Sequence, residues 1–140
     1  MTAKPKWLNP VAVVALIWNL IGCVAFIMDL RLTPADVAKL TAAQQAMYAA
    51  RPAWSIIATG VAVCAGALGC IGLILGKRWS YSLLLLSLVG VIVQDVSLFG
   101  MSGAISQAGS TAVILQCIVL AVALGLVWLA SRATRNGWLS

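Results

Sequence analysis

Four apolar runs dominate this sequence of 140 residues. They extend over about residues 10–30, 53–76, 79–100 and 111–132, and none contains more than one charged side chain. An apolar helix of about 20 residues is long enough to cross the ~30 Å hydrocarbon core of a bilayer. The sequence therefore predicts an all-α fold, a four-transmembrane-helix bundle, with residues 1–140 forming a single integral membrane domain.

The amino-acid composition agrees with a membrane environment. Hydrophobic residues make up 63% of the chain and charged residues only 9%, whereas soluble domains carry about 25% charged residues. The net charge of +6 does not indicate a nucleic-acid partner. The basic residues stand singly or in pairs at the ends of the apolar runs, where residues of the membrane interface belong. We expect the lipid bilayer to surround the protein.

Several classes of active site are excluded by the residue types present. The chain has no His and no Glu, so neither a Ser-His-Asp triad nor a Cys-His pair can form. The cysteines show no pairing or metal-ligand spacing, and we interpret them as small buried hydrophobic residues. They are Cys23, Cys64, Cys70 and Cys117. We expect no cofactor, no metal site and no enzymatic activity.

The first apolar run follows a short basic segment that contains Lys4 and Lys6. A cleaved signal peptide is one interpretation, but the run is longer than a normal signal core and lacks a convincing cleavage site. We therefore favour a retained span, with Asn9 as its N-cap and Pro10 at its first helical position. Asn19 falls near the middle of this span, where it would form an interhelical hydrogen bond or contact a ligand.

Residues 31–51 form the only sizeable polar segment. Thr33 with Asp36, and Thr41 with Gln44, have the spacing of capping boxes, so we predict two short helices over about 34–40 and 42–50. Their apolar stripe suggests an amphipathic element on the membrane surface or over the mouth of the bundle. An ordinary connector and a lid over a cavity explain residues 33–50 about equally well.

The later apolar runs and the segment between them contain several small residues. The second run carries Gly66, Gly69, Gly72 and Gly76, a spacing that allows close helix packing and, as a weaker alternative, a dimer face. Residues 100–110 (GMSGAISQAGS) are predicted to form a loop, and Ser110 can cap the last helix.

The distribution of Lys and Arg predicts the orientation. The side that holds both termini has six basic residues, and the side that holds residues 31–51 has three. The first set is Lys4, Lys6, Lys77, Arg78, Arg132 and Arg135, and the second is Arg31, Lys39 and Arg51. By the positive-inside rule, both termini of this multi-pass protein are expected in the cytoplasm and the 33–50 segment outside it.

Asp95 is the one charged residue between Trp79 and Ser131, and a charge inside an apolar span is costly unless it has a function or a partner. In the functional interpretation, an outward-facing polar pocket binds a hydroxyl-rich or cationic solute. Trp18 would stack on a sugar ring there. The predicted substrate-binding residues are Asp95, Gln94, Gln116, Asn19, Trp18 and Arg51. In the structural interpretation, Asp95 pairs with Arg51 or Arg31 and accepts a hydrogen bond from Gln116.

Four segments carry a resemblance to a known group of proteins: WNLIG at 18–22, LTPADVAKLTAAQQAMYAARPAW at 32–54, GALGCIGLILGKRW at 66–79 and SLVGVIVQD at 87–95. Together they resemble small bacterial four-span membrane proteins that are often labelled "sugar transporter". The resemblance covers nearly the whole chain. It implies a location in the bacterial inner (cytoplasmic) membrane and a transport function.

These observations leave three hypotheses for function. The leading one is a small transporter or binder of a polar solute, for example a sugar, that acts as a homo-oligomer or with a partner membrane protein. The second is a non-catalytic scaffold or accessory subunit that binds a partner through its glycine faces or the 33–50 segment. The third, a membrane enzyme, is the weakest because Asp95 would have to act almost alone.

Overall fold

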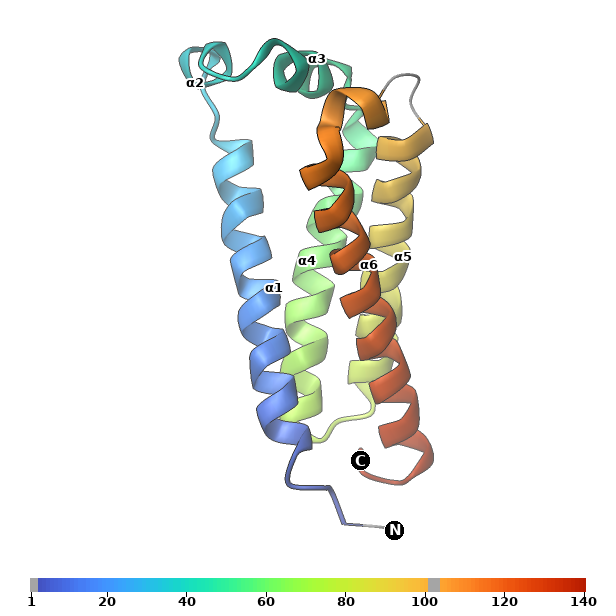
Figure 1. The fold of residues 1–140 in the computed structure, drawn as a ribbon. Helices are drawn as coiled ribbons and strands as arrows, with labels where there is room; N and C mark the ends of the chain where they lie inside the picture. Colours follow the sequence, from blue (N-terminus) through green and yellow to red (C-terminus); the bar gives the residue numbers. More distant parts are fainter. Residues whose placement is uncertain (1–2, 101–103) are drawn as a thin grey trace.

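The computed structural model describes residues 3–100 and 104–140, apart from the side chains of residues 43, 47, 50, 98, 99 and 104–112. The described secondary structure is entirely helical, which confirms the all-α prediction. The long helices lie side by side, and the short ones lie across one end of the bundle (Figure 1). The helices are α1 (Leu8–Leu30), α2 (Pro34–Ala38), α3 (Ala42–Ala50), α4 (Ala53–Leu75), α5 (Trp79–Gly100) and α6 (Ala104–Arg135).

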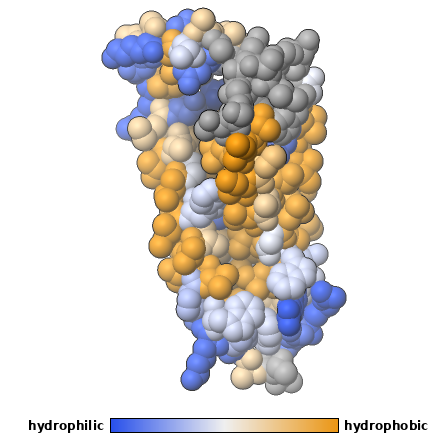
Figure 2. All heavy atoms as spheres, in the orientation of Figure 1, coloured by the Kyte–Doolittle hydropathy of each residue, from blue (hydrophilic) through white to orange (hydrophobic). Residues whose placement is uncertain are grey.

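The four long helices are the predicted spans. Each contains an apolar segment of 19 to 23 residues that is long and hydrophobic enough to cross a membrane. Figure 2 shows the corresponding apolar belt between two hydrophilic ends. The chain is therefore a multi-pass integral membrane protein.

Both capping boxes form as predicted. Thr33 accepts a hydrogen bond from the Asp36 amide, and the Asp36 carboxylate accepts one from the Thr33 amide. Thr41 and Gln44 do the same at the start of α3. These reciprocal bonds satisfy amide groups that the first turn of a helix leaves without partners. Helices α2 and α3 cover the end of the bundle opposite the termini, called here the α3 end.

Two predicted helix boundaries are wrong. Helix α1 begins at Leu8, and the Asn9 side chain is not its N-cap, because the Leu8 amide already bonds to the Pro5 carbonyl oxygen. Helix α6 begins at Ala104, so the predicted loop is helical from there and Ser110 lies inside the helix. The loop prediction relied on small residues, yet one Gly in a helix costs only about 1 kcal/mol. Residues 101–103 of that prediction lie outside the described part.

The helices converge at the end that holds the termini. The buried core there is Leu8, Ala12, Cys70, Leu73, Leu84, Leu126, Leu129, Ala130, Ala133 and Leu139. The Lys4 ammonium donates to the carbonyl oxygens of Leu73 and Ile74 at 2.8 and 2.9 Å. The Ser140 amide donates to the Gly76 carbonyl oxygen at 2.7 Å. Both chain ends are therefore held against the end of α4, which closes the bundle at this level.

Helix α4 packs between α1 and α5, and α5 packs on α6. Glycines make the α4–α5 contact close: a methyl group added at Gly69 would lie 2.6 Å from Leu84 Cγ, and one at Gly72 would lie 2.7 Å from Ser80 Cβ. Gly66 is equally enclosed, by Asn19 and Ser87. This confirms the prediction of close helix packing for these three residues. Gly76 instead ends α4 in the left-handed conformation, with a φ of 69°.

The four cysteines are free, and their environments differ. Cys70 is fully buried, as predicted, and Cys23 is partly buried. The prediction of burial is wrong for Cys64 and Cys117, which are exposed on the helix surface. In a protein surrounded by lipid, an apolar run need not be buried inside the protein, because the bilayer also solvates apolar side chains.

Candidate functional site

A cavity of about 970 Å³ opens inside the bundle toward its α3 end. It is lined by all four long helices and by side chains of α3. Helices α1 and α4 pack together, as do α5 and α6, but no comparable packing joins α1 to α6 among the described residues. Side chains of α1 and α6 therefore face each other across a space instead of filling it. Figure 2 shows the hollow between these two helices.

An ion pair lies at the α3 end of the cavity. Arg51 Nη1 donates to Asp29 Oδ2 at 2.6 Å, and both residues line the cavity. The Arg51 guanidinium also lies 4.9 Å from the centre of the Tyr48 ring, within range of a cation–π interaction. Asp29 is the second-last residue of α1, and Arg51 lies just before α4. The pair thus joins two helix ends at the level where the spans leave the membrane core.

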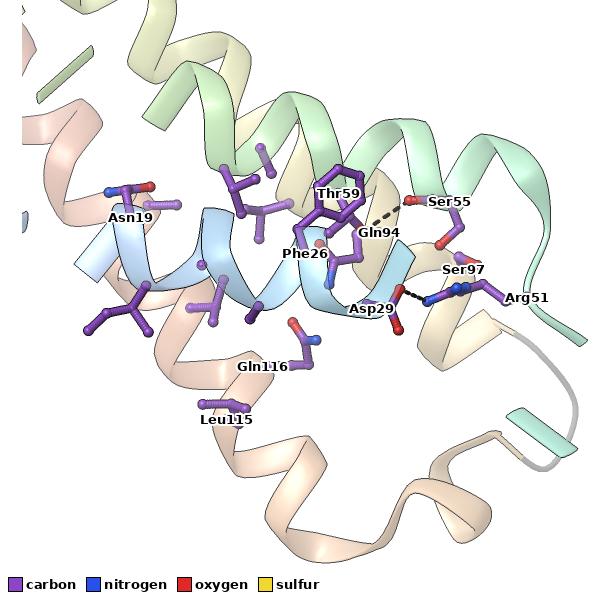
Figure 3. A pocket seen from close by; sticks show the side chains of 18 of the residues that line it. Asn19, Phe26, Asp29, Arg51, Ser55, Thr59, Gln94, Ser97, Leu115 and Gln116 are labelled. Carbon is purple, nitrogen blue, oxygen red and sulfur yellow. Dashed lines mark hydrogen bonds and ion pairs between the residues drawn. The ribbon is translucent and has the colours of Figure 1, made fainter. Parts of the chain in front are cut away.

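Polar side chains of three helices surround this ion pair. Gln94 of α5 and Gln116 of α6 line the cavity, and Figure 3 shows both amides at one level along α1, between Asn19 and Asp29. Ser55 and Thr59 of α4 line the same region, and Thr59 Oγ1 donates to the Ser55 carbonyl oxygen at 3.0 Å. The cavity therefore has a polar end built from amide, hydroxyl and paired charged groups.

Two buried polar atoms at this end have no hydrogen-bond partner among the described residues. They are Arg51 Nε, a donor, and Gln116 Oε1, an acceptor. Leaving a buried polar atom unpaired costs about 1–3 kcal/mol, so such atoms usually meet a protein group, water or a ligand. A hydroxyl group can both donate and accept, and so it can satisfy atoms of both kinds.

The rest of the cavity wall is mostly apolar. Helix α6 contributes Val119, Val122, Ala123 and Leu126, one helical face that runs away from Gln116. Helix α1 contributes Ile21, Gly22, Ala25 and Phe26 along its length. The cavity is therefore polar at the α3 end and mostly apolar toward the terminal end, where Asn19 and Ser87 also line it.

Five of the six predicted binding residues line the cavity: Trp18, Asn19, Arg51, Gln94 and Gln116. Asn19 lies apart from Arg51, Gln94 and Gln116, toward the mostly apolar end (Figure 3). Its amide Nδ2 donates to the Ala15 carbonyl oxygen at 2.9 Å and contacts Cys70 Sγ at 3.7 Å. These bonds within α1 and across to α4 favour the structural interpretation of Asn19, an interhelical hydrogen bond.

Asp95 is not among the residues that line the cavity. Successive residues of an α-helix point about 100° apart, so Gln94 faces the cavity while Asp95 faces elsewhere. Asp95 is buried, and its Oδ1 has no hydrogen-bond partner among the described residues. The predicted alternative, a pair with Arg51, does not form because Arg51 binds Asp29, and Arg31 is exposed.

The cavity also contains residues that the sequence prediction missed, above all Asp29 and Thr59. A usable signal existed for Asp29. Asp29 and Arg51 carry opposite charges and flank the facing ends of two spans joined by a short helical segment. Thr59 offered no such signal, because a single hydroxyl in an apolar helix often bonds to its own backbone.

Comparison of this chain with protein-family models, with curated proteins and with solved structures finds no match.

Proposed function

We propose that this protein binds a small hydroxyl-bearing solute, for example a sugar, and transports it or presents it within the membrane. The observation that carries the proposal is the pair of buried atoms Arg51 Nε and Gln116 Oε1, which have no partner among the described residues and belong to residues that line one cavity. Hydroxyl groups of the solute would accept from Arg51 and donate to Gln116.

The size and chemistry of the cavity support this proposal. Its volume of about 970 Å³ lies at the upper end of the range of about 300–1,000 Å³ that is typical of small-molecule sites. The Arg51–Asp29 ion pair leaves little net charge at the polar end, which favours an uncharged ligand. Trp18, Arg51, Gln94 and Gln116, which the sequence predicts as binding residues, line the cavity.

The proposed location is the bacterial inner membrane, with both termini in the cytoplasm. The excess of Lys and Arg on the terminal side supports this orientation. The resemblance to bacterial proteins labelled "sugar transporter" supports the same location and a transport role.

A scaffold or accessory subunit is the second candidate, and the packing restricts how it would work. Gly66, Gly69 and Gly72 are buried against neighbouring helices of the same chain, so they are not free to bind a partner. A partner would have to use the exposed faces of α2 and α3 or the lipid-facing surface.

Ligand binding in nanodiscs tests the proposal. The full chain is incubated with a panel of hydroxylated compounds, both free sugars and alkyl glycosides, and binding is measured against empty nanodiscs. We expect at least one compound to bind, and Gln116→Leu to weaken that binding about tenfold, since one well-placed hydrogen bond in a dry site is worth about 1.4 kcal/mol.

The matched control is Ile118→Leu, an exposed position of α6 that is not part of the cavity lining. It should leave binding unchanged. If no hydroxylated compound binds better than to empty nanodiscs, the proposed function is wrong.

A further inference from the structure

We infer that the ligand is an amphiphile, with an uncharged hydroxyl-bearing head and a hydrocarbon tail, that enters the cavity from the bilayer between α1 and α6. This inference rests on the proposed function and adds the chemical class of the ligand and its route. The observation behind it is the change in polarity along the cavity wall, from Arg51 and Gln116 at one end to Leu126 at the other.

The length of the apolar wall matches a lipid tail. Gln116 and Leu126 line the same cavity and are ten residues apart on α6, which corresponds to about 15 Å along the helix axis. That is about half of the ~30 Å hydrocarbon core, or the depth of one leaflet. A free sugar would fill the polar end and leave this apolar wall uncovered, whereas a single tail would cover it.

The charged part of the polar end lies where two candidate spans end. Asp29 precedes the end of α1 by one residue, and Arg51 lies two residues before the start of α4. A bilayer amphiphile that moves sideways into the cavity would therefore keep its head and its tail at their normal depths. No part of the ligand would have to cross an unfavourable region to reach the site.

The entrance lies between α1 and α6. Helix α1 packs on α4, but the described residues form no comparable contact between α1 and α6. The lining residues Ile21 and Ala25 of α1 and Leu115 of α6 are exposed, as expected for the two sides of an opening. Phe26 also lines the cavity, but its ring packs against Gly60 of α4. Among the described residues, the apolar side chains of Ile21 and Leu115 flank this route from the bilayer to the cavity.

The chemistry of the head follows from the groups at the polar end. Arg51 is already paired with Asp29 at 2.6 Å, so an anionic head would have to compete with a carboxylate in place. The remaining Arg51 Nε and Gln116 Oε1 require one acceptor and one donor, which a hydroxyl group supplies. A glycosyl or glycerol head fits these groups, and a phosphate head does not.

Photolabelling tests the inference with dodecyl glucoside that carries a diazirine in its tail. The full chain in phosphatidylcholine nanodiscs is irradiated with this probe, and the labelled residues are mapped by mass spectrometry. We expect label on cavity residues such as Phe26 and Val122. Unlabelled dodecyl glucoside should compete, and dodecyl phosphate and free glucose should not.

Two substitutions to Trp provide a matched comparison. Val122 lines the cavity, and Leu124 of the same helix is exposed and lies outside it. Val122→Trp should lower the competable label at least about tenfold by filling the tail region, whereas Leu124→Trp should leave it unchanged. Gln116→Leu provides a second, smaller change in case Val122→Trp does not fold, and it should also lower the label.

The outcomes separate this inference from the proposed function. If free glucose binds as well as dodecyl glucoside, the solute-binding function stands and the amphiphile inference is overturned. Uniform label over the lipid-facing side chains, or cross-links that show a second copy seated between α1 and α6, would also overturn it. If neither compound binds, the amphiphile inference fails, and the proposed function also fails if no compound of the hydroxylated panel binds.

Discussion

Arg51 and Asp29 connect the end of α1 to the start of α4 through an ion pair of 2.6 Å, directly beside the polar end of the cavity. Each side chain keeps about a third of its surface exposed, 28% for Arg51 and 31% for Asp29. The pair therefore holds two membrane-spanning helices together where solvent can still reach it. It also engages Arg51, one of the two Arg residues, with Arg31, that the sequence offered as partners for Asp95.

The first prediction concerns the strength of this pair. A double-mutant cycle of Asp29→Asn and Arg51→Gln should give a coupling free energy of about 1 kcal/mol, the upper range for partly exposed pairs. Unfolding in mixed micelles measures it. The matched control pairs Asp29→Asn with Arg31→Gln, at an exposed position two residues away, and should give no coupling. Equal coupling in both cycles would mean that the ion pair does not stabilise the helix contact.

The second prediction concerns glycine packing between α4 and α5. A methyl group at Gly90 would lie 2.8 Å from the Ala58 carbonyl oxygen and 3.0 Å from the Ala62 amide nitrogen, both backbone atoms that cannot turn away. We expect Gly90→Ala to lower the free energy of unfolding by about 1–3 kcal/mol.

Gly125→Ala is the matched control, because nothing lies within 4 Å of the added methyl group. It should be neutral or stabilise by up to about 1 kcal/mol, since Ala favours a helix over Gly. Thermal unfolding of both variants in one detergent makes the comparison. A loss at Gly125 as large as at Gly90 would show that the added methyl group at Gly90 is not the cause.

The third prediction concerns pH and the start of α2. Hydrogen bonds from the Thr33 amide and hydroxyl lower the pKa of Asp36 below its usual value of 3.8. Because folding lowers the pKa of Asp36, its ionised carboxylate stabilises α2 fully at pH values above the usual pKa. This stabilisation is lost as the pH falls through the lowered pKa. A ¹³C NMR titration of the Asp36 carboxyl should show the lowered pKa. Thr33→Val keeps the amide bond and removes the hydroxyl bond, so it should return the pKa part of the way toward 3.8. An unchanged pKa in that variant would contradict the role of the hydroxyl.

The fourth prediction concerns orientation. Lys39 of the connecting segment and Lys77 between α4 and α5 are both exposed and lie at opposite ends of the bundle. In a chain whose four native cysteines are replaced by Ala, a membrane-impermeant maleimide should label Lys39→Cys in intact bacterial cells. Lys77→Cys should react only after the membrane is disrupted. The cysteine-free chain is the control, and the reverse pattern would invert the proposed topology.

Local features of the sequence were sufficient to predict the four spans and the two short helices. The four spans follow from the length of the apolar runs, because a helix must satisfy its own backbone groups inside lipid. The helices α2 and α3 follow from the Thr33–Asp36 and Thr41–Gln44 spacings, because a capping box forms between residues three apart on one chain. Neither inference required any knowledge of how the helices pack.

Which side chains line the cavity depended on tertiary structure. The sequence alone identified Gln94, Gln116 and Arg51 as polar residues near one end of the spans, and the packing brought them to one cavity. Helix packing also places Arg51 within ion-pair distance of Asp29, and it leaves Asp95 outside the cavity lining. The physical reason is that neighbouring helix positions differ by about 100° in direction, so the rotation of each helix in the bundle decides which of two adjacent residues faces the cavity. That rotation is set by contacts between distant parts of the chain, such as Gly69 against Leu84, which the pattern along a single helix does not determine.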